Sequence, residues 1–164
     1  MNEILNFQST RIALFVAVTL IAGAAQRAAY AEEWQATAGA ESPDRGSQAL
    51  AYLPNEIWVH AGDSIRWSFP THERHTVSFL ATGQNRPPGF GPTFGVLAGC
   101  PGVTPDGSSF DGSQCVTSDI LLLGANEGPG ANLPTYSVQF PTAGNFKLVC
   151  LLHPDMKGVV HVLI

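Results

Sequence analysis

Residues 136–164 read YSVQFPTAGNFKLVCLLHPDMKGVVHVLI. Apolar residues alternate on both sides of a Pro/Gly turn, at Tyr136, Val138 and Phe140 before it and at Phe146, Leu148 and Cys150 after it. A period of two is typical of a β-strand with one buried face. This stretch therefore predicts two strands joined by a turn, a short loop from Cys150, and a final strand over residues 159–164.

The same period occurs in the first half of the chain. Its members are Ile57 and Val59, then Ile65, Trp67 and Phe69 after a Gly-Asp turn, then Val77 and Phe79. No segment after residue 31 has the apolar spacing of a long amphipathic helix. About seven or eight short strands separated by Gly/Pro turns predict an all-β fold, an antiparallel Greek-key β-sandwich.

Residues 81–134 differ from the rest because they hold most of the Gly and Pro residues and only residues 118–123 look like a strand. A loop of this length in a compact domain is either functional or tied down. Cys100 and Cys115 lie in this insertion and could form a disulfide bond, which would contribute roughly 3 kcal/mol in the chain-entropy description. Cys150, the third cysteine, would then remain unpaired.

Residues 1–31 have the features of a secretory signal peptide. Their apolar run, residues 12–25, is shorter than the roughly 20 residues that span a bilayer, and Ala29-Tyr30-Ala31 offers the small residues that signal peptidase requires. We therefore expect cleavage after Ala31 and a periplasmic or secreted protein, with an uncleaved membrane anchor as the alternative. Residues 32–47 are expected to be a flexible leader, and residues 48–164 a single domain without stable membrane insertion.

The charge of the chain excludes one class of partner. Removal of residues 1–31 leaves 6 Lys and Arg against 12 Asp and Glu, which is a net charge near −6. Binding of nucleic acid depends on cationic side chains that neutralise phosphates. We therefore expect no nucleic-acid partner, and we expect the domain to be a monomer.

Cys150, His153 and Met156 place a thiolate, an imidazole and a thioether in one short loop. This soft donor set suits an ion that cycles between Cu(I) and Cu(II), and one further imidazole would complete it. His75, beside the strand of Val77 and Phe79, is the expected source, although His72 lies only three residues away. The sequence therefore predicts one copper ion bound by His75, Cys150, His153 and Met156.

Zinc is the competing metal, but a structural zinc site prefers four strong donors and seldom uses a thioether. The chain has no C-x-x-C motif and no H-x-H motif from which a multinuclear centre could be built. Four ligands leave no open position for a substrate. We therefore expect an electron carrier and not an enzyme.

Several segments together resemble the cupredoxin family of type 1 blue copper proteins. They are residues 52–59, 61–63, 65–67 and 75–77 in the first half, and residues 136–140, 143–144, 150 and 156–158 in the second. The gap of two residues between His153 and Met156 is similar to that of amicyanins, whereas plastocyanins have a longer one. The resemblance implies that Cys150, His75 and His153 are strong copper ligands and that Met156 is a weak axial ligand.

The resemblance also implies that the domain passes single electrons between larger redox proteins. A partner would dock near His153, with Leu151, Leu152 and Pro154 as an apolar collar around the imidazole. Many cupredoxins have an Asn after the first His ligand, and its side chain braces the ligand loop; this chain has Thr76 there. Two other functions stay open, namely copper sequestration or delivery, and a disulfide-stabilised binding module without copper.

Overall fold

The computed structural model describes residues 31–86, 100, 102–118, 120–124 and 133–164. The predicted signal peptide, residues 1–31, lies outside this part of the chain except for Ala31. Within the described residues, no helix has the length and hydropathy needed to cross a bilayer.

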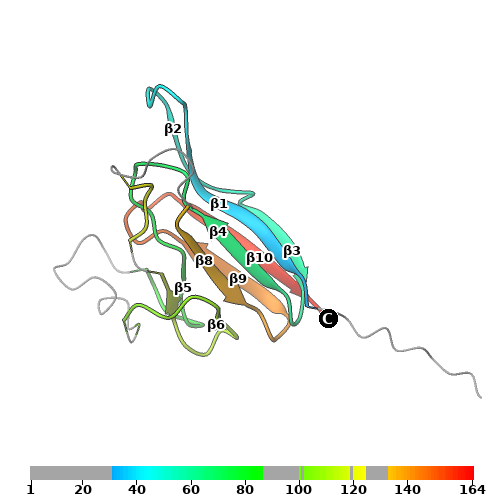
Figure 1. The fold of residues 1–164 in the computed structure, drawn as a ribbon. Helices are drawn as coiled ribbons and strands as arrows, with labels where there is room; N and C mark the ends of the chain where they lie inside the picture. Colours follow the sequence, from blue (N-terminus) through cyan, green and yellow to red (C-terminus); the bar gives the residue numbers. More distant parts are fainter. Residues whose placement is uncertain (1–30, 87–99, 101, 119, 125–132) are drawn as a thin grey trace, which may run out of the picture.

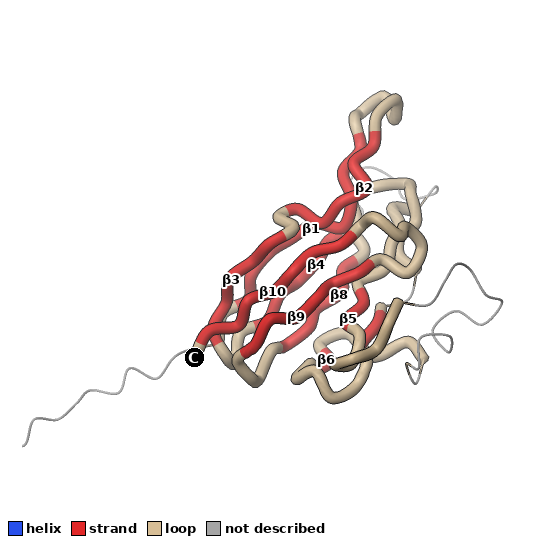
Figure 2. Tube along the Cα trace, turned by 180° about the vertical axis from the view of Figure 1, so that it is seen from behind, coloured by secondary structure: helices blue, strands red, loops and turns tan. Residues whose placement is uncertain are grey.

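Ten strands form two sheets of five, and no helix occurs in the described residues (Figures 1 and 2). The first sheet has the order β2-β1-β4-β8-β6 and the second the order β3-β10-β9-β5-β7. The strands are β1 (Glu33–Glu41), β2 (Gln48–Leu53), β3 (Glu56–His60), β4 (Ser64–Ser68), β5 (Ser78–Phe79), β6 (Ser108–Ser109), β7 (Val116–Thr117), β8 (Thr135–Gln139), β9 (Gly144–Val149) and β10 (Lys157–Leu163).

The predicted all-β fold is confirmed, but the sheets are mixed and not purely antiparallel. Strands β1 and β4, β10 and β3, and β6 and β8 are parallel pairs, whereas the remaining neighbours are antiparallel. A parallel pair needs a crossover connection. The connection between the parallel strands β1 and β4 runs first through β2, which lies beside β1, and then through β3, which lies in the second sheet.

The prediction that residues 32–47 form a flexible leader is wrong, because Glu33–Glu41 is a central strand of the first sheet. Asp63 fixes the start of this strand: its carboxylate accepts hydrogen bonds from Glu32 N (2.9 Å), Trp34 Nε1 (3.0 Å) and His60 N (2.9 Å). The strand buries only small side chains, Ala36 and Ala38. The sequence pattern missed it because no large apolar residues alternate there.

One apolar cluster fills the space between the sheets. Ile65 and Trp67 of β4 and Val138 of β8 face Leu148 of β9 and Val160 of β10 within it. The alternation predicted for residues 57–59 and 65–67 is confirmed, because the odd-numbered side chains are buried and their neighbours are more exposed.

The described part of the 81–134 insertion belongs to the sandwich. Its strand β6 is an edge strand of the first sheet, and its strand β7 is an edge strand of the second. Phe110 packs against Phe79, with the ring centres 5.1 Å apart. The predicted disulfide Cys100–Cys115 is present, with the two Cα atoms 4.9 Å apart. Residues 118–123 were predicted as a strand; the described residues of this range, 118 and 120–123, form no named strand, and Leu121 makes an isolated bridge with His75.

Candidate metal centre

The loop of residues 150–156 joins β9 to β10 at one end of the second sheet. Two hydrogen bonds within the loop fix its shape. The Cys150 N–H donates to the Met156 carbonyl (3.0 Å), and the Met156 N–H donates to the His153 carbonyl (3.1 Å). Because β9 and β10 continue as paired strands, the loop is closed without any bound group.

Thr76 braces this loop from a distant part of the sequence. Its Oγ1 accepts a hydrogen bond from the Leu151 N–H (2.9 Å), and its own N–H points to the Cys150 sulfur at 3.4 Å. The hydroxyl also contacts Ser78 Oγ at 3.1 Å. Threonine therefore provides the brace that the sequence comparison expected from an asparagine.

His75, Cys150 and His153 form one cluster, in which one ligand atom of each residue lies within 4.8 Å of the others. The His153 Nδ1 is 3.6 Å from the Cys150 sulfur, and the centres of the two imidazole rings are 5.0 Å apart. Cys150 is a buried free thiol. His72, the alternative to His75, lies outside the cluster, because its ring nitrogen contacts the Glu41 carboxylate at 2.8 Å.

His75 is fully buried, and neither ring nitrogen has a hydrogen-bond partner among the described residues. Its backbone is held in both directions by Leu121, with two N–H to carbonyl distances of 3.0 Å. The pKa of the imidazole is lowered from 6.5 to about 4, mainly by burial and to a smaller extent by the neighbouring His153, whereas Glu73 opposes the shift. The ring is therefore neutral near pH 7, with a lone pair available for a metal ion.

Gly39 allows the ring of His75 to lie where it does. The residue sits at a bulge of β1 with φ +83°, and a Cβ at this position would lie only 2.5 Å from the His75 Nε2. A positive φ is unfavourable for residues with side chains, and the contact is too short for any carbon atom. The bulge thus closes the Nε2 side of the imidazole against backbone.

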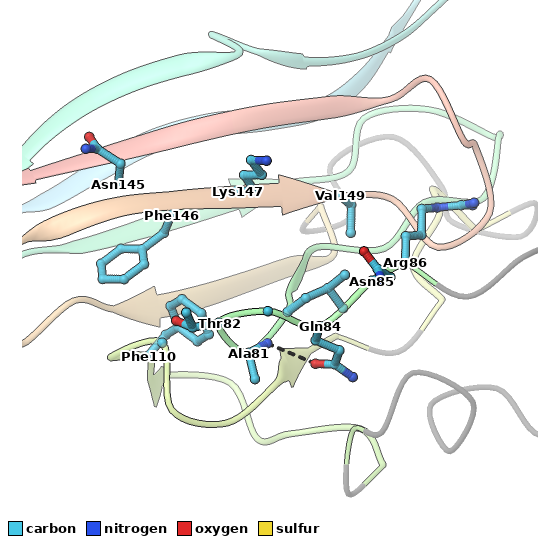
Figure 3. Close-up of a pocket in the computed structure, with 13 residues that line it drawn as sticks. Ala81, Thr82, Gln84, Asn85, Arg86, Phe110, Asn145, Phe146, Lys147 and Val149 are labelled. Atoms are coloured by element: carbon cyan, nitrogen blue, oxygen red, sulfur yellow. Dashed lines mark hydrogen bonds between the residues drawn. The ribbon is translucent and has the colours of Figure 1, made fainter.

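Arg86 binds the first two residues of the loop of residues 150–156. Its guanidinium donates to the Cys150 carbonyl (3.1 Å) and to the Leu151 carbonyl (2.7 Å). Arg86 and Val149 line a pocket of about 480 Å³ between residues 80–86 and β9 (Figure 3). The described lining of this pocket contains no residue of the cluster, although Arg86, which lines it, also binds the loop that carries Cys150.

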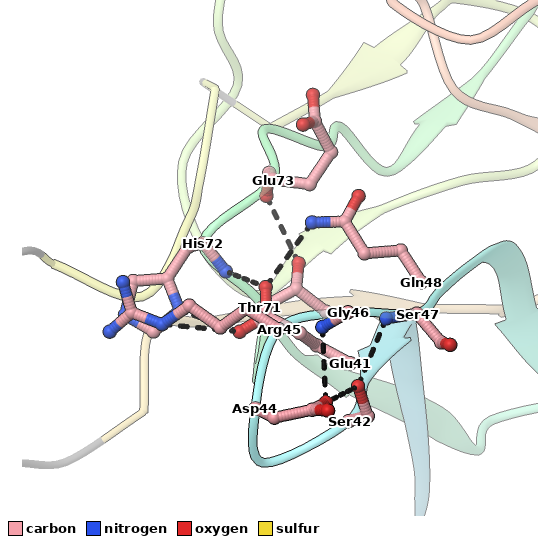
Figure 4. Close-up of polar contacts among 10 residues, drawn as sticks. All are labelled: Glu41, Ser42, Asp44, Arg45, Gly46, Ser47, Gln48, Thr71, His72 and Glu73. Carbon is pink, nitrogen blue, oxygen red and sulfur yellow. Dashed lines mark hydrogen bonds and ion pairs between the residues drawn. The ribbon is translucent and has the colours of Figure 1, made fainter.

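A polar network anchors the turn that precedes His75 (Figure 4). Glu41, at the end of β1, accepts the His72 N–H at 3.1 Å and contacts its ring nitrogen at 2.8 Å. The contact with His72 is the main reason why the pKa of the Glu41 carboxyl is lowered below 4.5. Glu73, the next residue in the turn, places its carboxylate 3.4 Å from the His153 Nε2.

The structure brings three of the four predicted ligands into contact range of one ion. Met156 is buried at the end of the same loop, and its role as an axial ligand stays a prediction. The predicted apolar collar is wrong for Leu151 and Leu152, whose exposed fractions are only 8% and 9%. Leu152 belongs to the apolar cluster between the sheets, and the backbone of Leu151 is held by Thr76 and Arg86.

The contacts of four residues with the cluster or its loop were not foreseen from the sequence, namely those of Gly39, Glu73, Arg86 and Thr76. Gly39 lay in the supposed leader, and Arg86 lay in a segment rich in Gly and Pro. The only available signal was the position of Thr76, directly after a candidate ligand.

The donor set fits copper on observations of this structure. A buried imidazole without partners is costly, because each unsatisfied buried polar atom loses its hydration. A metal ion would satisfy a nitrogen of His75 and the Cys150 thiolate together. One sulfur and two nitrogen donors suit copper, whereas a structural zinc site would require a fourth strong donor.

No protein-family model and no curated protein matches this chain. The chain is similar to solved structures of amicyanin. A Cu(I) form of one amicyanin variant is 18% identical over 79% of this chain and 81% of that one, with a TM-score of 0.47. A reduced Cu(I) variant at pH 4 is 21% identical over 84% and 87%, with a TM-score of 0.44. The chemistry of the site rests on the chain's own side chains.

Proposed function

We propose that this chain is an exported mononuclear type 1 copper protein that carries single electrons between redox partners. His75, Cys150 and His153 would hold the ion, with Met156 as a weak fourth ligand. Bound copper would supply a reversible change between Cu(I) and Cu(II). The observation that supports this most strongly is the fully buried His75, which lacks hydrogen-bond partners for its ring and lies beside a buried free thiol.

The surrounding residues would keep the ligands in place through the change of charge. Thr76 and Arg86 hold the loop, while Leu121 holds the backbone of His75. All these hydrogen bonds link residues that are far apart in the sequence, so the ligand positions depend on the fold and not on the ion. Rigid positions suit fast electron exchange, because little rearrangement is needed.

His153 is the expected point of contact with a redox partner. Its side chain is 20% exposed, whereas His75 and Cys150 are buried. Export agrees with the Cys100–Cys115 disulfide, because disulfides form and persist mainly outside the cytoplasm. The same proposal includes that the protein is a monomer and that it meets both an electron donor and an electron acceptor.

The test is copper binding by the protein and by two matched variants. The wild type should bind one copper ion per chain and develop the intense visible absorption of a copper–thiolate bond. Cys150→Ser should lose this absorption, whereas the double variant Cys100→Ser/Cys115→Ser should keep it, since that pair lies outside the cluster.

The opposite results separate the alternatives. A colourless protein, or full absorption in Cys150→Ser, would refute the proposal. A coloured protein that exchanges no electrons with small redox reagents would instead indicate copper sequestration or delivery.

A further inference from the structure

We propose that Glu73 is a positioning residue for His153, holding the imidazole by its Nε2 atom so that Nδ1 faces Cys150. The role matters for the proposed function, in which His153 is a ligand. The two contacts lie on opposite edges of one ring. Nε2 is 3.4 Å from the Glu73 Oε1, and Nδ1 is 3.6 Å from the Cys150 sulfur.

The chemistry of the two groups favours a proton on one of the two ring nitrogens of His153. A neutral imidazole has one N–H and one lone pair, whereas an ionised carboxylate can only accept hydrogen bonds. Glu73 therefore favours the tautomer with the proton on Nε2. The lone pair of Nδ1 then points toward the sulfur, where a metal ion would bind. A carboxylate behind a ligating imidazole orients metal ligands in this way in other proteins.

Glu73 is itself held in place without help from the metal centre. The Thr71 hydroxyl donates to the Glu73 carbonyl (3.0 Å), and the Leu123 N–H donates to the Thr71 carbonyl (2.6 Å). On the other side, Glu41 binds both the backbone and the ring of His72 (Figure 4). The turn is thus fastened to β1 and to residue 123, and the carboxylate of Glu73 is presented to His153 from a fixed backbone.

The alternative is an ion pair at the surface that has no effect, and the chain contains a comparison for it. His161 on β10 contacts the Glu56 Oε1 through its Nε2 at 2.9 Å, and the Glu56 side chain is 53% exposed. Glu73 is 40% exposed and faces a ring that is itself 20% exposed. Removal of Glu56 therefore removes the same kind of contact and the same charge at a pair of residues outside the cluster.

The test measures the ¹⁵N chemical shifts of the His153 ring in the full, metal-free protein, at a pH where its imidazole is neutral. These shifts report which ring nitrogen is protonated. In Glu73→Ala, the ratio of the Nε2–H to the Nδ1–H tautomer should fall by about 2- to 5-fold, the size expected for a partly exposed charged contact. Glu73→Gln, which keeps an oxygen acceptor, should lie closer to wild type, and Glu56→Ala should leave His153 unchanged.

A wild-type tautomer ratio in Glu73→Ala would overturn the proposal, as would an equal change in Glu56→Ala. The urea unfolding midpoint of each variant shows that the comparison is made on folded protein. Since the readout needs no copper, it fails or succeeds independently of the copper-binding test. A colourless wild type would refute the proposed function and leave the role of Glu73 in orienting His153 to be decided by the shifts alone.

Discussion

Substitution of Gly39 by alanine tests whether the backbone of β1 determines the position of the His75 ring. The new Cβ would lie 2.5 Å from the His75 Nε2 and 3.0 Å from the Thr71 Cγ2. An ordinary contact would need roughly 1 Å more, and overpacking of this kind typically costs about 1–3 kcal/mol. The positive φ of +83° adds about 1–2 kcal/mol for a residue with a side chain. We therefore expect Gly39→Ala to lose about 2–5 kcal/mol of unfolding free energy.

Gly107 provides the matched control, because its φ is +80° and a Cβ there would meet nothing within 4 Å. Gly107→Ala should therefore lose only the backbone contribution of about 1–2 kcal/mol. Urea unfolding of both metal-free variants measures the difference. If binding requires the displaced ring of His75 to return, Gly39→Ala should also bind copper about 10- to 100-fold more weakly than Gly107→Ala. Equal losses of stability together with equal affinities would refute the close approach of His75 to Gly39.

Three further predictions concern single groups. Asp63→Asn should lower the unfolding free energy by about 2–4 kcal/mol in urea titrations, since a charged acceptor of three N–H donors is replaced by a neutral one. Thr76→Val should cost about 1–3 kcal/mol in the same assay, because the buried Leu151 N–H loses its acceptor. In the metal-free protein, the pKa of His75 is about 4 when folded and 6.5 when unfolded. The unfolded chain therefore binds a proton at this residue first, and the unfolding free energy should fall as the pH falls from 6.5 to 4. His75→Gln should flatten that part of the pH profile of the urea midpoint; an unchanged profile would contradict the assignment.

The sequence allowed much of the sandwich to be predicted where large apolar residues alternate. The strands around Ile57, Ile65 and Val138 carry this pattern, and all three residues are in the core. Strand β1 carries Ala, Thr and Gly instead, which do not distinguish a buried strand from a flexible segment. Its parallel pairing with β4 depends on contacts between distant parts of the chain, which no local pattern encodes.

The candidate ligands were predictable because Cys150 and His153 lie in one short loop and His75 adjoins a clear strand. The support of these ligands was not predictable. Arg86 binds the loop across more than sixty residues of sequence, as the separations of 64 and 65 show. The burial of Leu151 and Leu152 was not predictable either, because a hydrophobic residue near a candidate metal ligand gives no indication of which way it faces.

Strands β1 and β10 place the two ends of the domain on the same side. Glu33 pairs with Ser64 and Leu163 pairs with His60, so both strands meet the turn of residues 60–64, whereas the loop of residues 150–156 lies at the other end of β10 (Figure 1). Seven residues of extended strand span about 20 Å. A linker fused to either end of the domain, or a surface that captures it there, would therefore leave the loop of residues 150–156 and the candidate metal centre turned outward.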